Sequence, residues 1–219
     1  MRVKDGLCSR RAKEAKCQAL GLRRKEEAKS RKSGPLWLIA LEKHMPDLLK
    51  KVEIRILMHM TAAACQTAGS VWGRTSRDRL AAYRQFTVDI MAGRSREELL
   101  RYRRAMYMRA YRVGRLLSLL PGLHDEERKK RLIVLLYRNI ESEILDAGDD
   151  LTEDGDFKWR MHIPRCFFSA QYTPKICYVM SGFDAGIICG VFGGGTLRFS
   201  RRLTEGCSAC SALYSRDVK

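Results

Sequence analysis

The 219-residue sequence has no apolar run long enough to cross a membrane and no apolar stretch behind its first charged residues. A membrane-spanning helix needs about 20 predominantly apolar residues. The longest candidate here, around Ile187–Phe192, is far shorter and is followed by three glycines. A secretory signal would need an apolar region after its basic start. These absences predict a soluble protein without a transmembrane helix, located in the cytoplasm.

Metal-ligand motifs are also scarce, although the chain has eight cysteines. Cys207 and Cys210 form a single C-x-x-C pair, whereas a structural zinc site needs four ligands. No second C-x-x-C and no histidine pair completes the set, so a metal at Cys207/Cys210 and a pair of free thiols both stay open. The sequence requires no cofactor. In the cytoplasm the thiols are predicted to be reduced.

Acidic residues are few, because 25 Asp and Glu stand against 42 Lys and Arg, which gives a net charge of +17. Twelve of the basic residues and only four acids fall in residues 1–34, so nearly half of the excess lies in this basic tail. The tail ends at Ser33-Gly34-Pro35 and is predicted to be flexible or partly helical. It either binds a polyanion such as nucleic acid or is only a solvated segment.

Residues 35–150 are predicted to be helical. Apolar residues recur at helical spacing in four segments, 36–68, 76–92, 95–120 and 125–148. The strongest start signal is Ser95 followed by Glu98, a capping box. Arg101, Arg104, Arg112 and Arg115 share the face opposite the apolar stripe, which indicates a solvated amphipathic helix rather than a nucleic-acid site.

Residues 151–219 have a different texture, with short segments rich in β-branched and aromatic residues. They predict strands at 157–163, 187–192, 196–200 and 212–215, and one helix at 172–183. The predicted fold class is therefore α+β: a helical N-terminal half packed on a small mixed or antiparallel C-terminal sheet. Residues 35–219 are expected to form one domain, with a ligand pocket where the two parts meet.

The chain resembles the L-2-amino-thiazoline-4-carboxylic acid hydrolase family over about residues 157–215. The resemblance rests on Leu203, on Gly206 three residues later, and on Cys210 four beyond that, ahead of a strand that carries Tyr214. Upstream, Cys166 follows a short strand, and a helix and Asp184 follow Cys166. Two departures concern the substrate: Ser211-Ala212 stands where the family has Asp-Phe, and Arg201-Arg202 stands where it has threonines.

The resemblance implies hydrolytic opening of a cyclic amidine-like C–N or C–S bond, as in an aminothiazoline carboxylate. Such a reaction needs an activated thiol or water. Either Cys210 or Cys166 attacks directly, or Asp184 or His162 acts as general base. These four residues are the catalytic candidates.

The carboxylate of such a substrate needs a cationic partner, for which Arg201, Arg202 and Arg198 are candidates. Arg201 and Arg202 are adjacent, so on a strand only one of them can enter a pocket. Tyr214 completes the predicted substrate-binding residues.

Two other classes of function remain open. One is a non-catalytic domain that senses a small molecule or a metal, and the other is a nucleic-acid-associated protein that uses residues 1–34. The sequence does not determine the oligomeric state.

Overall fold

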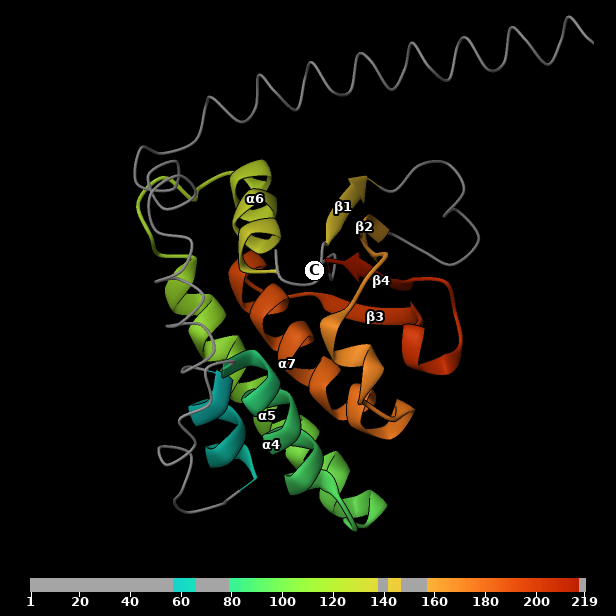
Figure 1. Cartoon of the computed structure of the whole chain (residues 1–219). Helices are drawn as coiled ribbons and strands as arrows, with labels where there is room; N and C mark the ends of the chain where they lie inside the picture. The colour runs from blue at the N-terminus through green and yellow to red at the C-terminus, as the bar shows by residue number, and fades with distance from the viewer. Residues whose placement is uncertain (1–56, 66–78, 138–141, 147–156, 217–219) are drawn as a thin grey trace, which may run out of the picture. The chain divides into compact units, whose positions relative to one another are not determined.

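A computed structural model describes residues 57–65, 79–137, 142–146 and 157–216 (Figure 1). The chain divides into two compact units, Met1–His44 and Met45–Lys219, and every described residue belongs to the second. The basic tail and most of the helix predicted at 36–68 lie outside the described residues. Of that helix, residues 57–64 are described and are helical.

Local capping signals set the ends of the described helices. α4 spans Arg79–Met91, α5 spans Arg96–Leu117, and α6 spans Glu126–Leu136. The capping box at the start of α5 is confirmed, because Ser95 Oγ accepts from the Glu98 N–H at 3.2 Å and Glu98 Oε2 accepts from the Ser95 N–H at 2.9 Å. Asp125 caps α6 in the same way, accepting from the Arg128 N–H at 2.8 Å. α6 ends twelve residues earlier than the predicted limit of 148.

The sheet confirms the α+β class and is antiparallel throughout. Its strands are β1 (Glu143–Asp146), β2 (Phe157–Ile163), β3 (Thr196–Arg201) and β4 (Cys210–Ser215), in the order β1-β2-β4-β3. The bounds predicted for β2 agree with the structure, and those for β3 and β4 differ by one and two residues. β1 contradicts the sequence analysis, which extended a helix through it. The long-range pairing of Ile144 with Met161 explains the difference, because no local pattern reports it.

α7 (Pro174–Phe192) is the central element, and it corrects a second prediction. The sequence analysis placed a helix at 172–183 and a strand at 187–192, but the structure has one continuous helix. The β-branched pair Ile187-Ile188 favours a strand locally. Tertiary packing overrides that preference. The helix ends at Gly193, whose φ of +84° is the left-handed conformation of a C-cap glycine.

Glycines let α7 lie directly against α5. Gly182, Gly186 and Gly190 recur every four residues and so line one face of α7. A Cβ at Gly186 would meet the Tyr107 carbonyl oxygen of α5, and one at Gly190 would meet that of Tyr111. The approach is reciprocal, because a Cβ at Gly114 of α5 would meet the Ile187 carbonyl of α7.

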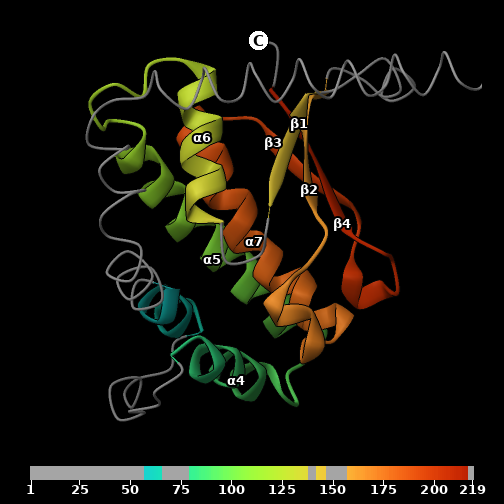
Figure 2. The ribbon, with the colours of Figure 1, turned by 45° about the horizontal axis from the view of Figure 1, so that its top comes forward.

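The sheet covers α7 with one face only. Figure 2 shows α5, α6 and α7 on one side of the four strands. Trp159 and Met161 of β2 and Ala212 and Tyr214 of β4 are each at most 1% exposed, so their side chains form the inner face. The Trp159 ring stacks on Tyr214 at 4.7 Å and lies 5.3 Å from Phe192 of α7.

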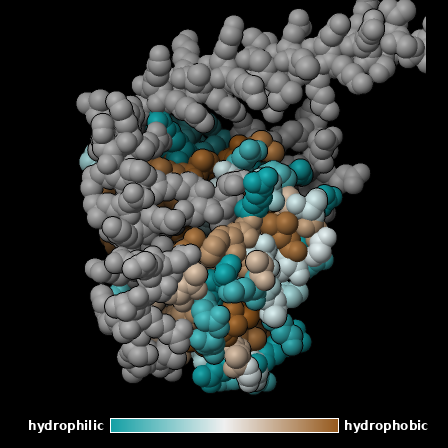
Figure 3. Space-filling model, viewed as in Figure 1, coloured by the Kyte–Doolittle hydropathy of each residue, from teal (hydrophilic) through white to brown (hydrophobic). Residues whose placement is uncertain are grey.

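By length and composition alone, α7 could cross a membrane, which corrects the sequence analysis: it divided this segment into a helix and a strand and so found no apolar run of that length. However, 67% of its apolar window is buried inside the fold. On the face shown in Figure 3, hydrophilic side chains interrupt the apolar surface. α7 therefore has the character of a core helix, which agrees with a soluble protein.

The glycine contact predicts that replacing one of its glycines by alanine lowers the stability of the fold instead of raising it. In an open helix position Gly→Ala is expected to stabilise by about 1 kcal/mol. Gly190→Ala should instead destabilise by about 1–3 kcal/mol, because the new methyl group must displace α5 backbone. Urea unfolding would measure this, with Lys175→Ala on the exposed first turn of α7 as the control. A more stable Gly190→Ala variant would contradict the packing.

Candidate functional site

Asp184 lies on α7, two positions from the nearest glycine of the α5 contact. Its side chain is directed away from α5, because two residues along a helix correspond to a rotation of about 200°. Desolvation raises the pKa of the Asp184 carboxyl group to about 6, although Tyr137 and Arg202 both favour its charged form. A carboxyl group with this pKa gains and loses its proton near neutral pH.

Tyr137 holds the Asp184 carboxylate in place. The Tyr137 hydroxyl donates to Asp184 Oδ1 at 2.9 Å, and Tyr137 is itself buried at the C-terminal end of α6. A charge-stabilising hydrogen bond lowers the pKa of its acceptor, so the desolvation at Asp184 is larger than the net shift shows. The sequence analysis missed Tyr137, because its contact with Asp184 joins residues 47 positions apart.

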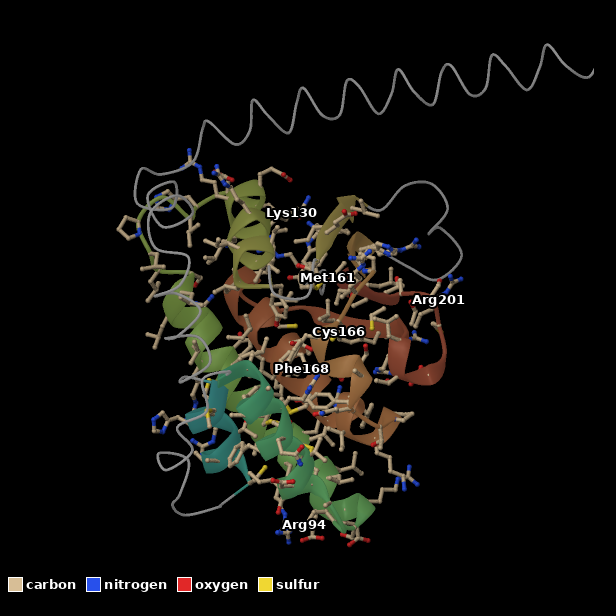
Figure 4. All side chains as sticks on the ribbon, viewed as in Figure 1. Arg94, Lys130, Met161, Cys166, Phe168 and Arg201 are labelled. Atoms are coloured by element: carbon tan, nitrogen blue, oxygen red, sulfur yellow. The ribbon has the colours of Figure 1, made fainter. Side chains whose placement is uncertain are left out.

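Cys166 and Cys210, the two predicted thiols, lie within reach of this charge. Cys166 (labelled in Figure 4) precedes the short helix η3 (Phe167–Ala170). Cys210 opens β4. Burial is the main cause that raises the pKa of both thiols, to about 11 for Cys166, and the Asp184 charge raises both further. Cys210 and Cys166 also interact electrostatically. The structure therefore brings Cys166, Cys210 and Asp184 together.

Cys177 is a third thiol of this group, which the sequence analysis did not select. It lies seven residues before Asp184 on α7 and so on the same face of the helix. Burial raises its pKa first, the nearby Thr204 hydroxyl opposes the rise, and Asp184 and Cys210 add to it. The spacing of seven was visible in the sequence, but its meaning depended on a continuous helix.

Arg202, rather than Arg201, faces the group. Arg202 is half-buried before the short helix η4 (Leu203–Glu205), and its positive charge lowers the pKa of Asp184, Cys177 and Cys210. Its Nη1 donates to Glu205 Oε1 at 3.0 Å, whereas its buried Nε has no acceptor among the described residues. Arg201 is exposed and pairs with Ser211 on the outer side of the sheet, at the edge of the molecule in Figure 4.

Three other predicted site residues lie elsewhere. His162 alternates with the buried Met161 and Ile163 on β2, so its side chain is on the outer face of the sheet. Arg198 is exposed and also faces outward on β3, opposite Leu213. Tyr214 is a packing residue in the inner face, and its hydroxyl donates to the Gly194 carbonyl oxygen at 2.9 Å.

Two buried tyrosines near Asp184 are further residues that sequence reasoning missed. The Asp184 charge contributes to the raised pKa of Tyr83 and Tyr172, which burial mainly causes. Tyr83 pairs with Thr61 at 3.1 Å, and Tyr172 pairs with Thr87 at 2.6 Å. Both hydroxyl groups are therefore already hydrogen-bonded.

Metal ligation has no counterpart among the described residues, where no three of His, Cys, Asp and Glu are placed to hold an ion. The six described cysteines, Cys207 and Cys210 among them, are free thiols. The group as a whole combines a proton carrier, three neutral thiols and one guanidinium. It suits the binding of a small molecule that has a cationic or proton-accepting part and an anionic part.

Comparisons with known proteins leave the family open. No family model matches the chain, and no curated protein matches it. Among solved structures, the chain is similar to a vinyl-4-reductase family protein from Methanocaldococcus jannaschii, with a TM-score of 0.36 and 10% sequence identity. The alignment covers 74% of this chain and 92% of that one. A similarity at this level carries no conclusion about function.

The raised pKa of Asp184 predicts a pH-dependent effect of Asp184→Asn on stability. Because the folded-state pKa lies above the unfolded one, the stability linked to this group is fully present below about pH 4 and is lost as the pH rises through about 6. The charged form costs about 3 kcal/mol, and asparagine removes that cost while it still accepts from Tyr137. The variant should match the wild type at pH 4 and exceed its stability at pH 8.

Urea unfolding at both pH values would test this difference. Glu143→Gln, which replaces an exposed carboxylate on β1, serves as the control and should show no such trend. An Asp184→Asn variant less stable than the wild type at pH 8 would show that the carboxylate is held by interactions stronger than its desolvation.

Proposed function

We propose that the chain is a hydrolase that opens a non-peptide C–N bond of a small cyclic amidine, such as an aminothiazoline carboxylate. The observation that carries the proposal is Asp184, a desolvated carboxyl group with a pKa of about 6 that a tyrosine hydroxyl orients beside thiols and one guanidinium. A carboxyl group tuned toward neutral pH is typical of general acid–base catalysis. The sequence resemblance over residues 157–215 supports the substrate class.

Asp184 acts as the base in this proposal. At pH 7 it is mostly ionised, so it takes a proton from a water molecule that attacks the amidine carbon. A C–O bond forms, and Asp184 passes the first water proton to the ring nitrogen. The ring C–N bond then breaks as the new hydroxyl group becomes a carbonyl, and Asp184 carries the hydroxyl proton to the leaving nitrogen, which departs as an amine. The net change is the addition of one water, and Asp184 ends in its starting state.

Direct attack by a thiolate is disfavoured by the raised pKa values of the cysteine thiols. A cysteine with a pKa of about 11, as at Cys166, is almost wholly protonated at pH 7, and the thiolate is the nucleophilic form. The Asp184 charge disfavours a second negative charge on Cys166 or Cys210. We therefore assign both thiols to the wall of the site and the chemistry to water.

Arg202 supplies the cation for the substrate carboxylate. It is half-buried, and its Nε lacks an acceptor among the described residues. Its guanidinium carbon lies 5.3 Å from the centre of the Phe199 ring and 5.7 Å from that of Tyr178, within cation–π range of both aromatic side chains. A substrate with a protonated amidine and a carboxylate would place these groups at Asp184 and Arg202 respectively.

The proposal predicts an acid limb in the pH–rate profile. With an aminothiazoline carboxylate, kcat/KM should rise with pH and level off above about pH 6, because the base must be ionised. Tyr137→Phe should move this limb to higher pH, since the lost hydrogen bond no longer stabilises the carboxylate. Mass spectrometry of the ring-opened product, heavier by one water, measures turnover.

Matched variants separate the roles. Asp184→Asn should abolish turnover, and Cys166→Ala and Cys210→Ala should retain most of kcat, whereas Glu143→Gln should behave as wild type. If a cysteine variant loses turnover and the acid limb of Tyr137→Phe does not shift, the nucleophile is a cysteine thiol and not water. Substrate-induced thermal stabilisation without any product would overturn the hydrolase in favour of a non-catalytic ligand-binding domain.

A further inference from the structure

The outer face of the sheet is not used by the proposed site. Alternation along the strands directs Arg160 and His162 of β2, and Arg198 of β3, away from α7. A register shift between Phe199 and Arg201 places Arg201 opposite Ser211, an outward position of β4, so Arg201 belongs to the same face. Among the described elements, no helix lies over this face (Figure 2). The face is therefore a separate surface, formed by the same strands that carry the inner site on their other side.

Cross-strand register brings these basic residues into two rows. Arg160 and Arg198 both pair with Leu213 of β4, and His162 and Arg201 both pair with Ser211. Neighbouring strands are about 4.8 Å apart, so the backbones of the two residues in a row are about 10 Å apart across β4. Lys158 is exposed on the same strand as Arg160, and Glu143 on β1 is the acidic residue beside His162.

The side chains of the arginines on this face have no acceptor in the part of the chain that the structure describes. Among the described residues, no hydrogen bond or ion pair occupies Arg160, Arg198 or Arg201. Arg160 carries a second indication, because its Nε is buried and lacks a hydrogen-bond partner in this part of the chain. By contrast, Arg202, next to Arg201, bonds to Glu205 on the other side.

We infer that the outer face of the sheet binds the phosphate backbone of a single-stranded nucleic acid. Arginine forks match phosphate oxygens in pairs, and several at fixed spacing can each hold a separate phosphate. This surface is distinct from the basic tail of residues 1–34. It is also distinct from the arginines of α5, which lie on another element.

The shape and chemistry of the face select this partner over two others. The outer face of a four-stranded sheet presents no helix or two-stranded ribbon that would enter a duplex groove. An anionic membrane would require apolar or aromatic side chains that insert among the lipids. In the described part of β1 and β4, the apolar side chains at outward positions are Leu145, which is 39% exposed, and Leu213. Two leucines make too small an apolar surface for insertion into a membrane. Binding would follow the backbone, without base stacking, so it should not depend on sequence.

The test compares two triple variants of the full chain that remove equal charge. Arg160→Gln with Arg198→Gln and Arg201→Gln changes the outer face, and Arg101→Gln with Arg104→Gln and Arg112→Gln changes exposed positions of α5. Fluorescence anisotropy with labelled oligo(dT) and oligo(rU) at several salt concentrations gives the affinity. Circular dichroism and thermal melts establish that both variants are folded.

The outer-face variant should raise Kd by about tenfold or more and flatten the slope of log K against log salt by about 2, as expected for three lost phosphate contacts. The α5 variant should change both much less. Equal weakening by the two variants, or no weakening by the first, would assign the affinity to overall charge or to the tail and end the inference. Binding to phosphatidylserine vesicles but not to either oligonucleotide would also overturn it.

Discussion

The rest of the structure depends on the contact of α7 with α5 without side chains between them. Gly186 and Gly190 on one helix and Gly114 on the other leave room for backbone against backbone, and no other residue type fits there without displacement. This contact fixes the rotation of α7 about its own axis. Since the glycine face is turned to α5, the opposite face, with Cys177 and Asp184, is directed away from it.

The sheet completes the enclosure of that second face. Inner-face residues of β2 and β4 pack against α7, and Cys210 is delivered at the start of β4, opposite Ile163. A carboxylate on a surface helix would keep its ordinary pKa. Asp184 instead lies where burial outweighs both a tyrosine hydroxyl and a guanidinium, so the fold produces a proton carrier that titrates near neutrality.

Local signals predicted those parts of the fold that are decided locally. The starts of α5 and α6 could be predicted from Ser95 with Glu98 and from Asp125, because a capping hydrogen bond joins residues only three apart. The β-branched and aromatic residues of 157–163 were enough to predict β2. The two errors, a strand at 187–192 and a helix through 143–146, both concern segments whose state depends on distant partners. The regular spacing of Gly182, Gly186 and Gly190 was the available sign of a packed helix, and it extended through the predicted strand.

The candidate site was predictable to a similar degree. The Asp184 charge acts on Cys166 and Cys210, and Arg202 rather than Arg201 acts on Asp184 and Cys210, a choice that the sequence analysis left open. His162 could have been assigned outward from the alternation along the strand, since Met161 and Ile163 flank it and are apolar. Tyr137 could not have been predicted, because no residue near it in the sequence indicates that its hydroxyl group bonds to Asp184 of α7.

The strands place different charged side chains on the two faces of the sheet, because successive residues of a strand point to opposite faces. In a chain with net charge +17, the general field favours ionised carboxylates, yet the pKa of Asp184 is raised. Within the described ranges, Arg202 is the arginine whose charge lowers that pKa, and Arg160, Arg198 and Arg201 are not among its causes. The outward cations therefore have little influence on the inner carboxylate. The same strands thus carry the buried carboxyl group's surroundings on one side and the outward arginines on the other.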